Sequence, residues 1–180
     1  MKTTLLLLSL FSLLAPLLRA DDDTPVPPEV QKLVESMLTA FKASNDVALK
    51  ACWHSPEVAG KLKAAEAVKE GKDPAKEEEK EIKKQTRNLE ATGIRAGQIR
   101  VLITKHFGEL AQLTLNRVEL DVDEDAVSEK PRYSNVKIRL RSGDGTALKL
   151  EIDDAVRIDG VWKFQGRIDD EITIELPDED

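Results

Sequence analysis

Residues 136–152 read VKIRLRSGDGTALKLEI. On each side of the central SGDG, apolar and charged residues alternate with a period of two, the pattern of a β-strand that buries one face. The two glycines and Asp144 between the runs are typical of a tight turn. This stretch therefore predicts an antiparallel β-hairpin with one apolar face and one charged face.

Further alternating runs flank this hairpin on both sides. Residues 113–122 alternate with a change of phase at 116–117, which predicts a β-bulge there. The second hairpin strand continues to residue 158, and the turn at 159–160 leads into a last apolar run over 162–168. Together these runs predict an antiparallel meander of about four strands.

Helical periodicity precedes the strands. An amphipathic pattern runs from the prolines at 27–28 to Phe41, and a second short helical piece is expected over 45–53. Residues 61–92 form a charged helical segment, rich in Lys, Glu and Ala and divided at 71–74. Its charge run is typical of a solvated helix face, and an interaction surface is the alternative.

Helical spacing resumes between residues 99 and 110. Gly93 and Gly97 are expected to break the chain before it, and Gly108 to end it. A strand over 99–103 is the alternative. Helices followed by a meander indicate an α+β fold, with N-terminal amphipathic helices packed on a curved antiparallel meander.

The first twenty residues resemble an export signal. Lys2 precedes an apolar run that ends at Leu18, and Arg19 and Ala20 close it. The run is shorter than the roughly 20 apolar residues of a membrane-spanning helix. We expect cleavage after Ala20 and an exported protein, periplasmic or extracellular, that is not integral to the membrane. An uncleaved anchor is the alternative.

The remaining boundaries follow from composition. We expect 1–20 to be the signal peptide, 21–28 a disordered acidic and proline-rich leader, 29–176 a single α+β domain, and 177–180 an acidic tail.

Charge limits the partners of the chain. It has 34 acidic and 27 basic residues, and losing Lys2 and Arg19 with the signal would leave 25 basic residues and a net charge of −9. Such a surface repels nucleic-acid phosphates, so we expect no nucleic-acid partner. The expected partner is a small hydrophobic ligand or a protein.

Cys52 is the single cysteine, so no internal disulfide is expected. Phe41, Ala48 and Cys52 fall near one helical face, which favours a buried structural thiol. A reactive or intermolecular thiol is the alternative.

Motifs for catalysis are sparse. The sequence contains no nucleophile elbow, phosphate-binding glycine loop or zinc-protease motif. Asp121, Asp123 and Asp125 match the start of a calcium loop, but Ala126 stands where the turn needs glycine. We therefore predict no metal site and no cofactor.

One acidic residue interrupts the strand pattern. In residues 148–158 the even positions are apolar except Asp154, and an unpaired carboxylate on that face is costly to bury. It is a candidate catalytic base, together with His54 and Tyr133. The alternative is a bulge at 153–154 that turns the carboxylate outward.

Two further groups of side chains are candidates for binding. Trp53, Trp162 and Phe164 are candidate ligand-binding residues, with core packing as the alternative. A basic row of Lys137, Arg139 and Arg141 favours cross-strand pairs with Glu151 and Asp153, and an anion site is the alternative.

Two passages resemble the NTF2-like superfamily, which includes ketosteroid-isomerase-like and SnoaL-like proteins. They are residues 41–49, FKASNDVAL, which resemble its first helix and kinked continuation, and residues 159–164, DGVWKF, which resemble its closing hairpin. The resemblance implies a sheet curled around the helices as a cone with a pocket. The charged segment 61–92 departs from the compact pattern of that superfamily.

The sequence favours an exported, soluble, non-catalytic binding or interaction domain. One alternative is a small isomerase or dehydratase that uses Asp154 as a pocket carboxylate. Another is a structural protein of the cell envelope. The NTF2-like resemblance does not choose among them, because that superfamily holds enzymes, binding domains and inert scaffolds.

Overall fold

The computed structural model describes residues 25–122, 132–169 and 172–175. The predicted signal peptide at 1–20, most of the leader, the region of the calcium-like motif after residue 122, and the tail at 177–180 lie outside the described residues.

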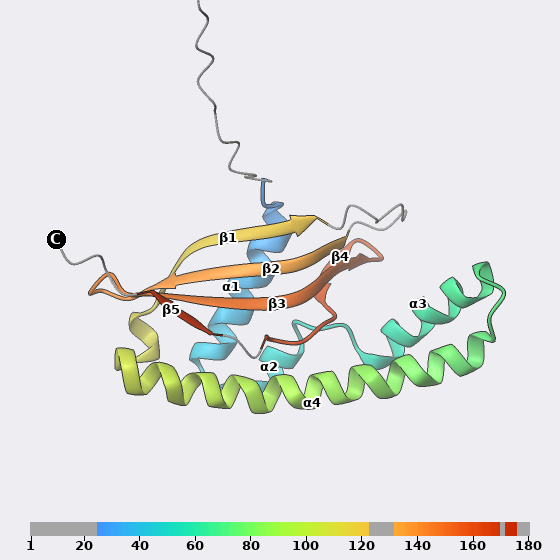
Figure 1. The fold of residues 1–180 in the computed structure, drawn as a ribbon, viewed down its shortest axis with the longest axis horizontal. Helices are drawn as coiled ribbons and strands as arrows, with labels where there is room; N and C mark the ends of the chain where they lie inside the picture. Colours follow the sequence, from blue (N-terminus) through green and yellow to red (C-terminus); the bar gives the residue numbers. More distant parts are fainter. Residues whose placement is uncertain (1–24, 123–131, 170–171, 176–180) are drawn as a thin grey trace, which may run out of the picture.

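The helices come first in the chain and the strands follow, which confirms the α+β class (Figure 1). The elements are α1 (Pro28–Lys42), α2 (Asp46–Lys50), α3 (Pro56–Lys69), α4 (Pro74–Phe107), the 3₁₀ turn η1 (Leu110–Gln112), β1 (Thr114–Val122), β2 (Arg132–Arg141), β3 (Ala147–Ile158), β4 (Val161–Phe164) and β5 (Thr173–Glu175).

Polar side chains cap the starts of three helices. The Asn45 side chain accepts from the Ala48 amide at 3.0 Å to begin α2, and the Ser55 hydroxyl accepts from the Val58 amide at 3.4 Å to begin α3. Asp73 accepts from two amides in the first turn of α4. These bonds satisfy backbone donors that lack a partner within the helix.

The expected break at Gly93 and Gly97 is wrong, because α4 runs through both glycines to Phe107. A glycine costs a helix about 1 kcal/mol relative to alanine. Burial of Ala96, Ile99 and Ile103 along one face of the helix offsets that cost. The helix does end at Gly108, as predicted, with φ at +76°.

The strands form one antiparallel sheet in the order β1-β2-β3-β4, as the alternating runs predicted. The bulge expected in β1 is present, as a register shift between Leu115 and Arg117. A fifth strand, β5, was not predicted and pairs with the beginning of β3.

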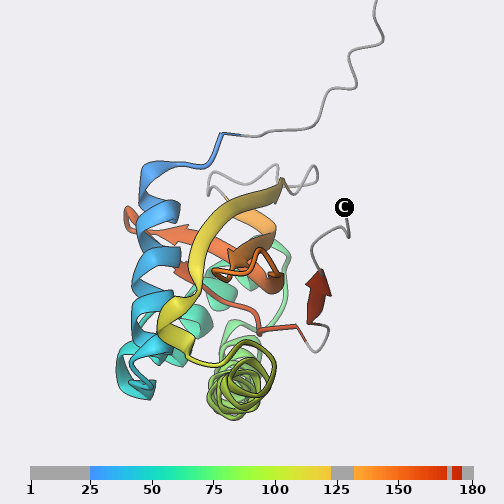
Figure 2. The ribbon, with the colours of Figure 1, turned by 90° about the vertical axis from the view of Figure 1, so that its left-hand side faces the viewer.

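The core lies between the sheet and two helices. Figure 2 shows α1 against one side of the sheet and α4 end-on along its margin. The fully buried large side chains come from both parts of the chain: Val30, Met37, Phe41, Leu49, Ile99, Ile103, Leu113, Ile138, Leu140, Leu148, Ile152 and Phe164.

The alternation of core-facing and outward-facing residues in β3 is interrupted by a kink. In β3, Leu148, Leu150 and Ile152 face the core, but Asp154 adopts a positive φ of 51° and Ala155 then takes the buried position. From Ile152 to Ala155 the strand advances three residues while its partner segment, from Ile168 to Phe164, advances four. The extra residue bends the sheet, so that the end of β3 and all of β4 turn toward the helices.

Gly166 lies at the tightest point of this bend. Its amide donates to the Asp153 carbonyl at 3.1 Å, and its own carbonyl accepts from the Trp53 indole at 2.8 Å. A Cβ at this position would lie 2.4 Å from the Asp153 carbonyl oxygen. Only glycine therefore fits without moving the backbone of β3.

We predict that Gly166→Ala destabilises the protein by about 3 kcal/mol, the upper end of the usual cost of overpacking. Urea denaturation followed by tryptophan fluorescence measures the change. Gly143→Ala is the matched control, because a Cβ there meets nothing within 4 Å, and its effect should stay within about 0.5 kcal/mol. Equal stability of both variants would contradict this account of the bend.

Candidate functional site

The structure places Asp154 at the kink with its carboxylate on an arginine. One carboxylate oxygen accepts from Arg132 Nε at 3.0 Å and from Nη2 at 2.6 Å. The side chain is 28% exposed. The kink turns the carboxylate away from the buried side of β3. This agrees with the alternative interpretation, a bulge that turns Asp154 outward, and not with a base in a closed pocket.

His54 is buried and is bound to the backbone of the sheet. Its imidazole Nε2 donates to the Val156 carbonyl at 3.2 Å, and its amide donates to the Phe164 carbonyl at 2.9 Å. Burial lowers the pKa of His54, although the Val156 carbonyl opposes that shift. A neutral imidazole with a backbone acceptor serves here to fasten the segment after α2 along β4.

The candidate aromatic residues pack against one another in two pairs. The rings of Trp53 and Phe164 lie 5.0 Å apart, and those of Tyr133 and Trp162 stack at 5.1 Å. Burial raises the pKa of the Tyr133 hydroxyl. Trp53, Trp162 and Phe164 are buried members of the core, so they fill space that a ligand would need.

The three candidate catalytic residues do not form one constellation. Within the described residues, no hydrogen bond joins any two of Asp154, His54 and Tyr133, and each has a different partner. A general base must have its basic atom free to reach the proton that it abstracts, whereas the Asp154 carboxylate is bound to Arg132 and His54 to a backbone carbonyl. The arrangement holds the bend of the sheet and the contact of the segment after α2 with β4.

Cys52 is buried, as predicted, with its thiol 3.6 Å from the Ala48 carbonyl oxygen. Burial raises its pKa, which keeps the thiol protonated and unreactive.

Two residues of the basic row on β2 pair with acidic residues of β1. Lys137 lies 2.8 Å from Asp121, and Arg139 lies 2.8 Å from Glu119. The expected partners on β3 are therefore wrong: Glu151 instead accepts from Asn135 at 2.9 Å and pairs with the neighbouring lysine of its own strand. With Lys137 and Arg139 paired across the strands, this face offers little concentrated positive potential to an anion.

No cluster of three metal-ligating side chains occurs in the described ranges. An open groove with a volume of about 520 Å³ runs along α1 and α2. It is lined by three alanines and by Lys32, Glu35, Ser36, Thr39 and Asn45, and most of its lining surface is apolar. Because the groove is open, it would cover only one side of a bound molecule, whereas small-ligand sites usually bury most of the ligand surface.

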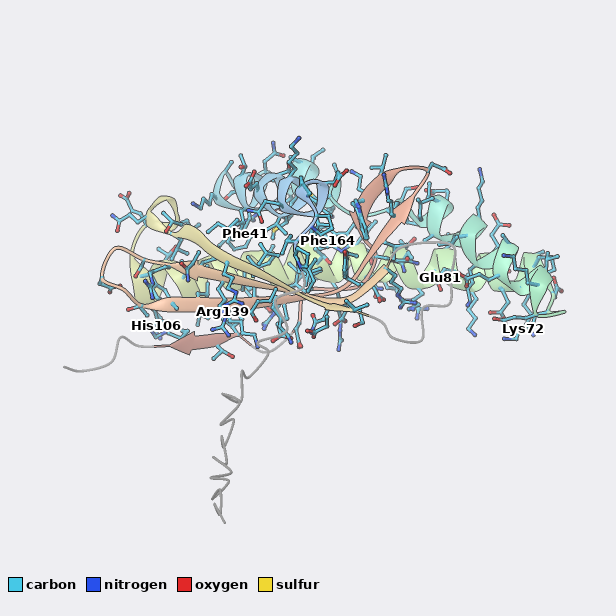
Figure 3. All side chains as sticks on the ribbon, turned by 90° about the horizontal axis from the view of Figure 1, so that it is seen from above. Phe41, Lys72, Glu81, His106, Arg139 and Phe164 are labelled. Carbon is cyan, nitrogen blue, oxygen red and sulfur yellow. The ribbon has the colours of Figure 1, made fainter. Side chains whose placement is uncertain are left out.

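The most exposed feature is an arm formed by α3 and the N-terminal half of α4, residues 56–90. Figure 1 shows this helical pair extending past the end of the sheet. In Figure 3 Lys72 marks its far end, whereas Phe41 and Phe164 lie in the body of the molecule. The two helices approach closely, since a Cβ on Gly60 would come within 2.6 Å of the Ile82 side chain.

The outer side of the arm is strongly charged. Lys76, Lys80, Lys83 and Arg87 are all exposed and recur at helical spacing along one side of α4. Lys80 and Lys83 pair with Glu77 and Glu79 of the preceding turn, at 3.8 and 2.6 Å. The sequence identified this segment as charged and helical, but not as an arm, because its contacts depend on where α4 docks.

No protein-family model, curated protein or solved structure matches the chain. No helix within the described residues is long and apolar enough to cross a membrane.

We predict that Asp154→Asn changes the free energy of unfolding by less than about 1 kcal/mol. Asparagine tolerates a positive φ, and a partly exposed ion pair contributes little. Asp154→Val should cost about 2 kcal/mol, because a β-branched residue is strained in this conformation. Thermal or urea denaturation measures both, and equal losses would contradict the conformational role of Asp154.

A second prediction concerns pH. Because the pKa of His54 is lowered in the folded state, the unfolded chain binds its proton more readily, and stability falls as the pH drops below the ordinary value of 6.5. His54→Gln should reduce the loss of stability between about pH 7.5 and about pH 5.5. His106→Gln, at an exposed position, is the control. An unchanged pH slope in His54→Gln would contradict the assignment.

Proposed function

We propose that this chain is an exported, non-catalytic interaction domain whose arm, residues 56–90, binds a protein partner. The observation that carries the proposal is the arm itself. It stands out from the layered body, and along its length α3 is the element that packs against α4. A helical pair with one bare side presents an extended surface for a partner.

The energetics of the arm support this proposal. Ile82 and Leu89 are the large apolar residues in the N-terminal half of α4, and both are only partly buried. The contact with α3 depends on small residues such as Ala59, Gly60 and Ala67. The small apolar contact between α3 and α4 adds little to the stability of the body. A role in stabilising the fold therefore explains the arm poorly.

The charge pattern indicates the class of partner. The row of Lys76, Lys80, Lys83 and Arg87 is basic on a chain whose net charge is negative. Within the described residues Lys76 and Arg87 have no ion-pair partner, so an acidic segment of another protein complements the two ends of this row, and binding of that kind weakens as salt rises. Val68, 65% exposed on α3, offers an apolar contact on the same arm.

The proposal also includes export of the protein and a relation to the NTF2-like superfamily. The pattern of residues 1–20 supports export, and a fold built without a disulfide around a buried Cys52 is compatible with it. The order of α1 and α2 before a bent meander supports a relation to the NTF2-like superfamily. The packed aromatic core argues against the pocket that a small-molecule ligand or an isomerase activity needs.

We expect a photo-crosslinking amino acid at Val68 to capture one discrete protein partner in cells. The same probe at Val161, 53% exposed on β4, is the matched control and should capture nothing comparable. Changing Lys80 and Lys83 to Glu should abolish the Val68 product and lower the melting temperature only slightly, since the two ion pairs that it breaks are exposed.

Equal crosslinking from Val68 and Val161, or a Val68 product that survives the charge reversal, would contradict recognition by the arm. Specific retention of a small hydrophobic molecule by the purified protein would favour the ligand-binding alternative.

A further inference from the structure

Two large apolar side chains lie on the bare side of α4, beyond the arm. Ile94 is 67% exposed and Val101 is 70% exposed. They are two turns apart, on the side of the helix opposite the buried Ile99 and Ile103. Exposed apolar residues at this spacing on one helix are the pattern of a helix–helix contact.

Small residues surround them. Gly97 lies between Ile94 and Val101, and a Cβ built on it meets nothing within 4 Å. Ala91 is also exposed on this stretch. Gly97, beside the exposed Gln98, leaves a gap on the helix surface between the two branched side chains, and another helix can approach closely at this gap.

The charges at the two ends of the stretch are opposite. Glu90 is exposed at the N-terminal end and Lys105 at the C-terminal end. Within the part of the chain that the structure describes, neither residue has an ion-pair partner. Their separation matches a symmetric arrangement centred between Gly97 and Gln98.

We propose that α4 forms an antiparallel homodimer through this stretch, residues 90–105. A two-fold axis between Gly97 and Gln98 places Ile94 of each copy on Val101 of the other. The same axis places Glu90 of each copy opposite Lys105 of the other. The surface is thus complementary to itself in both shape and charge, as a two-fold interface requires.

The parallel arrangement is disfavoured by the same residues. It would place Glu90 against Glu90 and Lys105 against Lys105, and both pairs are repulsive. The contact involves few apolar side chains, so it is at the small end of specific interfaces. We therefore expect a concentration-dependent dimer rather than an obligate one.

The dimer goes beyond the proposed function and does not depend on it. Because the helices are antiparallel, the two arms would point in opposite directions from the common centre. Such an assembly presents two equivalent binding surfaces, which raises the effective affinity for a partner with repeated sites.

Sedimentation equilibrium of the purified protein between about 5 µM and about 500 µM tests the proposal. We expect a monomer–dimer equilibrium that Val101→Glu shifts to monomer. Val161→Glu, at a similarly exposed valine on β4, is the matched control and should leave the equilibrium unchanged. A monomeric wild type over this range, or a dimer unaffected by Val101→Glu, would overturn the proposal.

A charge swap tests the register. Glu90→Lys should weaken the dimer by about tenfold or more, and the double variant Glu90→Lys with Lys105→Glu should restore it. In a Cys52→Ala background, a mixture of Ile94→Cys and Val101→Cys proteins should form disulfide-linked dimers faster than either protein alone. Faster linkage between identical positions would indicate a parallel pair and overturn the antiparallel register.

Discussion

The architecture depends on α4 having a continuous apolar face along only half of its length. Ala96, Ile99 and Ile103 dock the C-terminal half against α1 and the sheet. Arg100 reinforces that contact, since its guanidinium lies 5.1 Å from the centre of the Phe41 ring and donates to the Phe41 carbonyl at 2.9 Å. The N-terminal half has no such face, and α3 is the element that packs along it. One helix thus joins a packed body to an exposed arm.

The body itself is shaped by a bend in the sheet. The positive φ of Asp154 and the absence of a side chain at Gly166 let β3 and β4 turn toward the helices. The turn brings Trp162 onto Tyr133 and Phe164 onto Trp53. Residues that resemble catalytic or ligand-binding groups in the sequence therefore lie at the bend, and the surfaces that we propose for binding are the arm and the exposed side of α4.

The sequence predicted the elements well where the signal is local. Alternation in 136–152 predicted the central hairpin, and the phase change at 116–117 predicted the bulge in β1.

Prediction from the sequence failed where packing between distant segments determines the local structure. Gly93 and Gly97 remain helical because the core holds the turns around them. The short strand β5 forms where it pairs with the edge of β3 and packs Ile174 against the core. Asp154 and His54 are candidates in the sequence because carboxylates and imidazoles are common catalytic groups. Their partners, Arg132 and a backbone carbonyl, are set by the fold, and no local sequence pattern predicts them.

Hydrogen exchange along α4 tests the central claim most directly. If the helix is docked along half its length, amides in 96–106 should exchange as slowly as those of strands β2 and β3. Amides in 76–88 should exchange at least about 100-fold faster, together with those of α3, through local opening of the arm. Uniform protection from residue 76 to residue 106 would show that α4 is stabilised as one unit, and would contradict the division into body and arm.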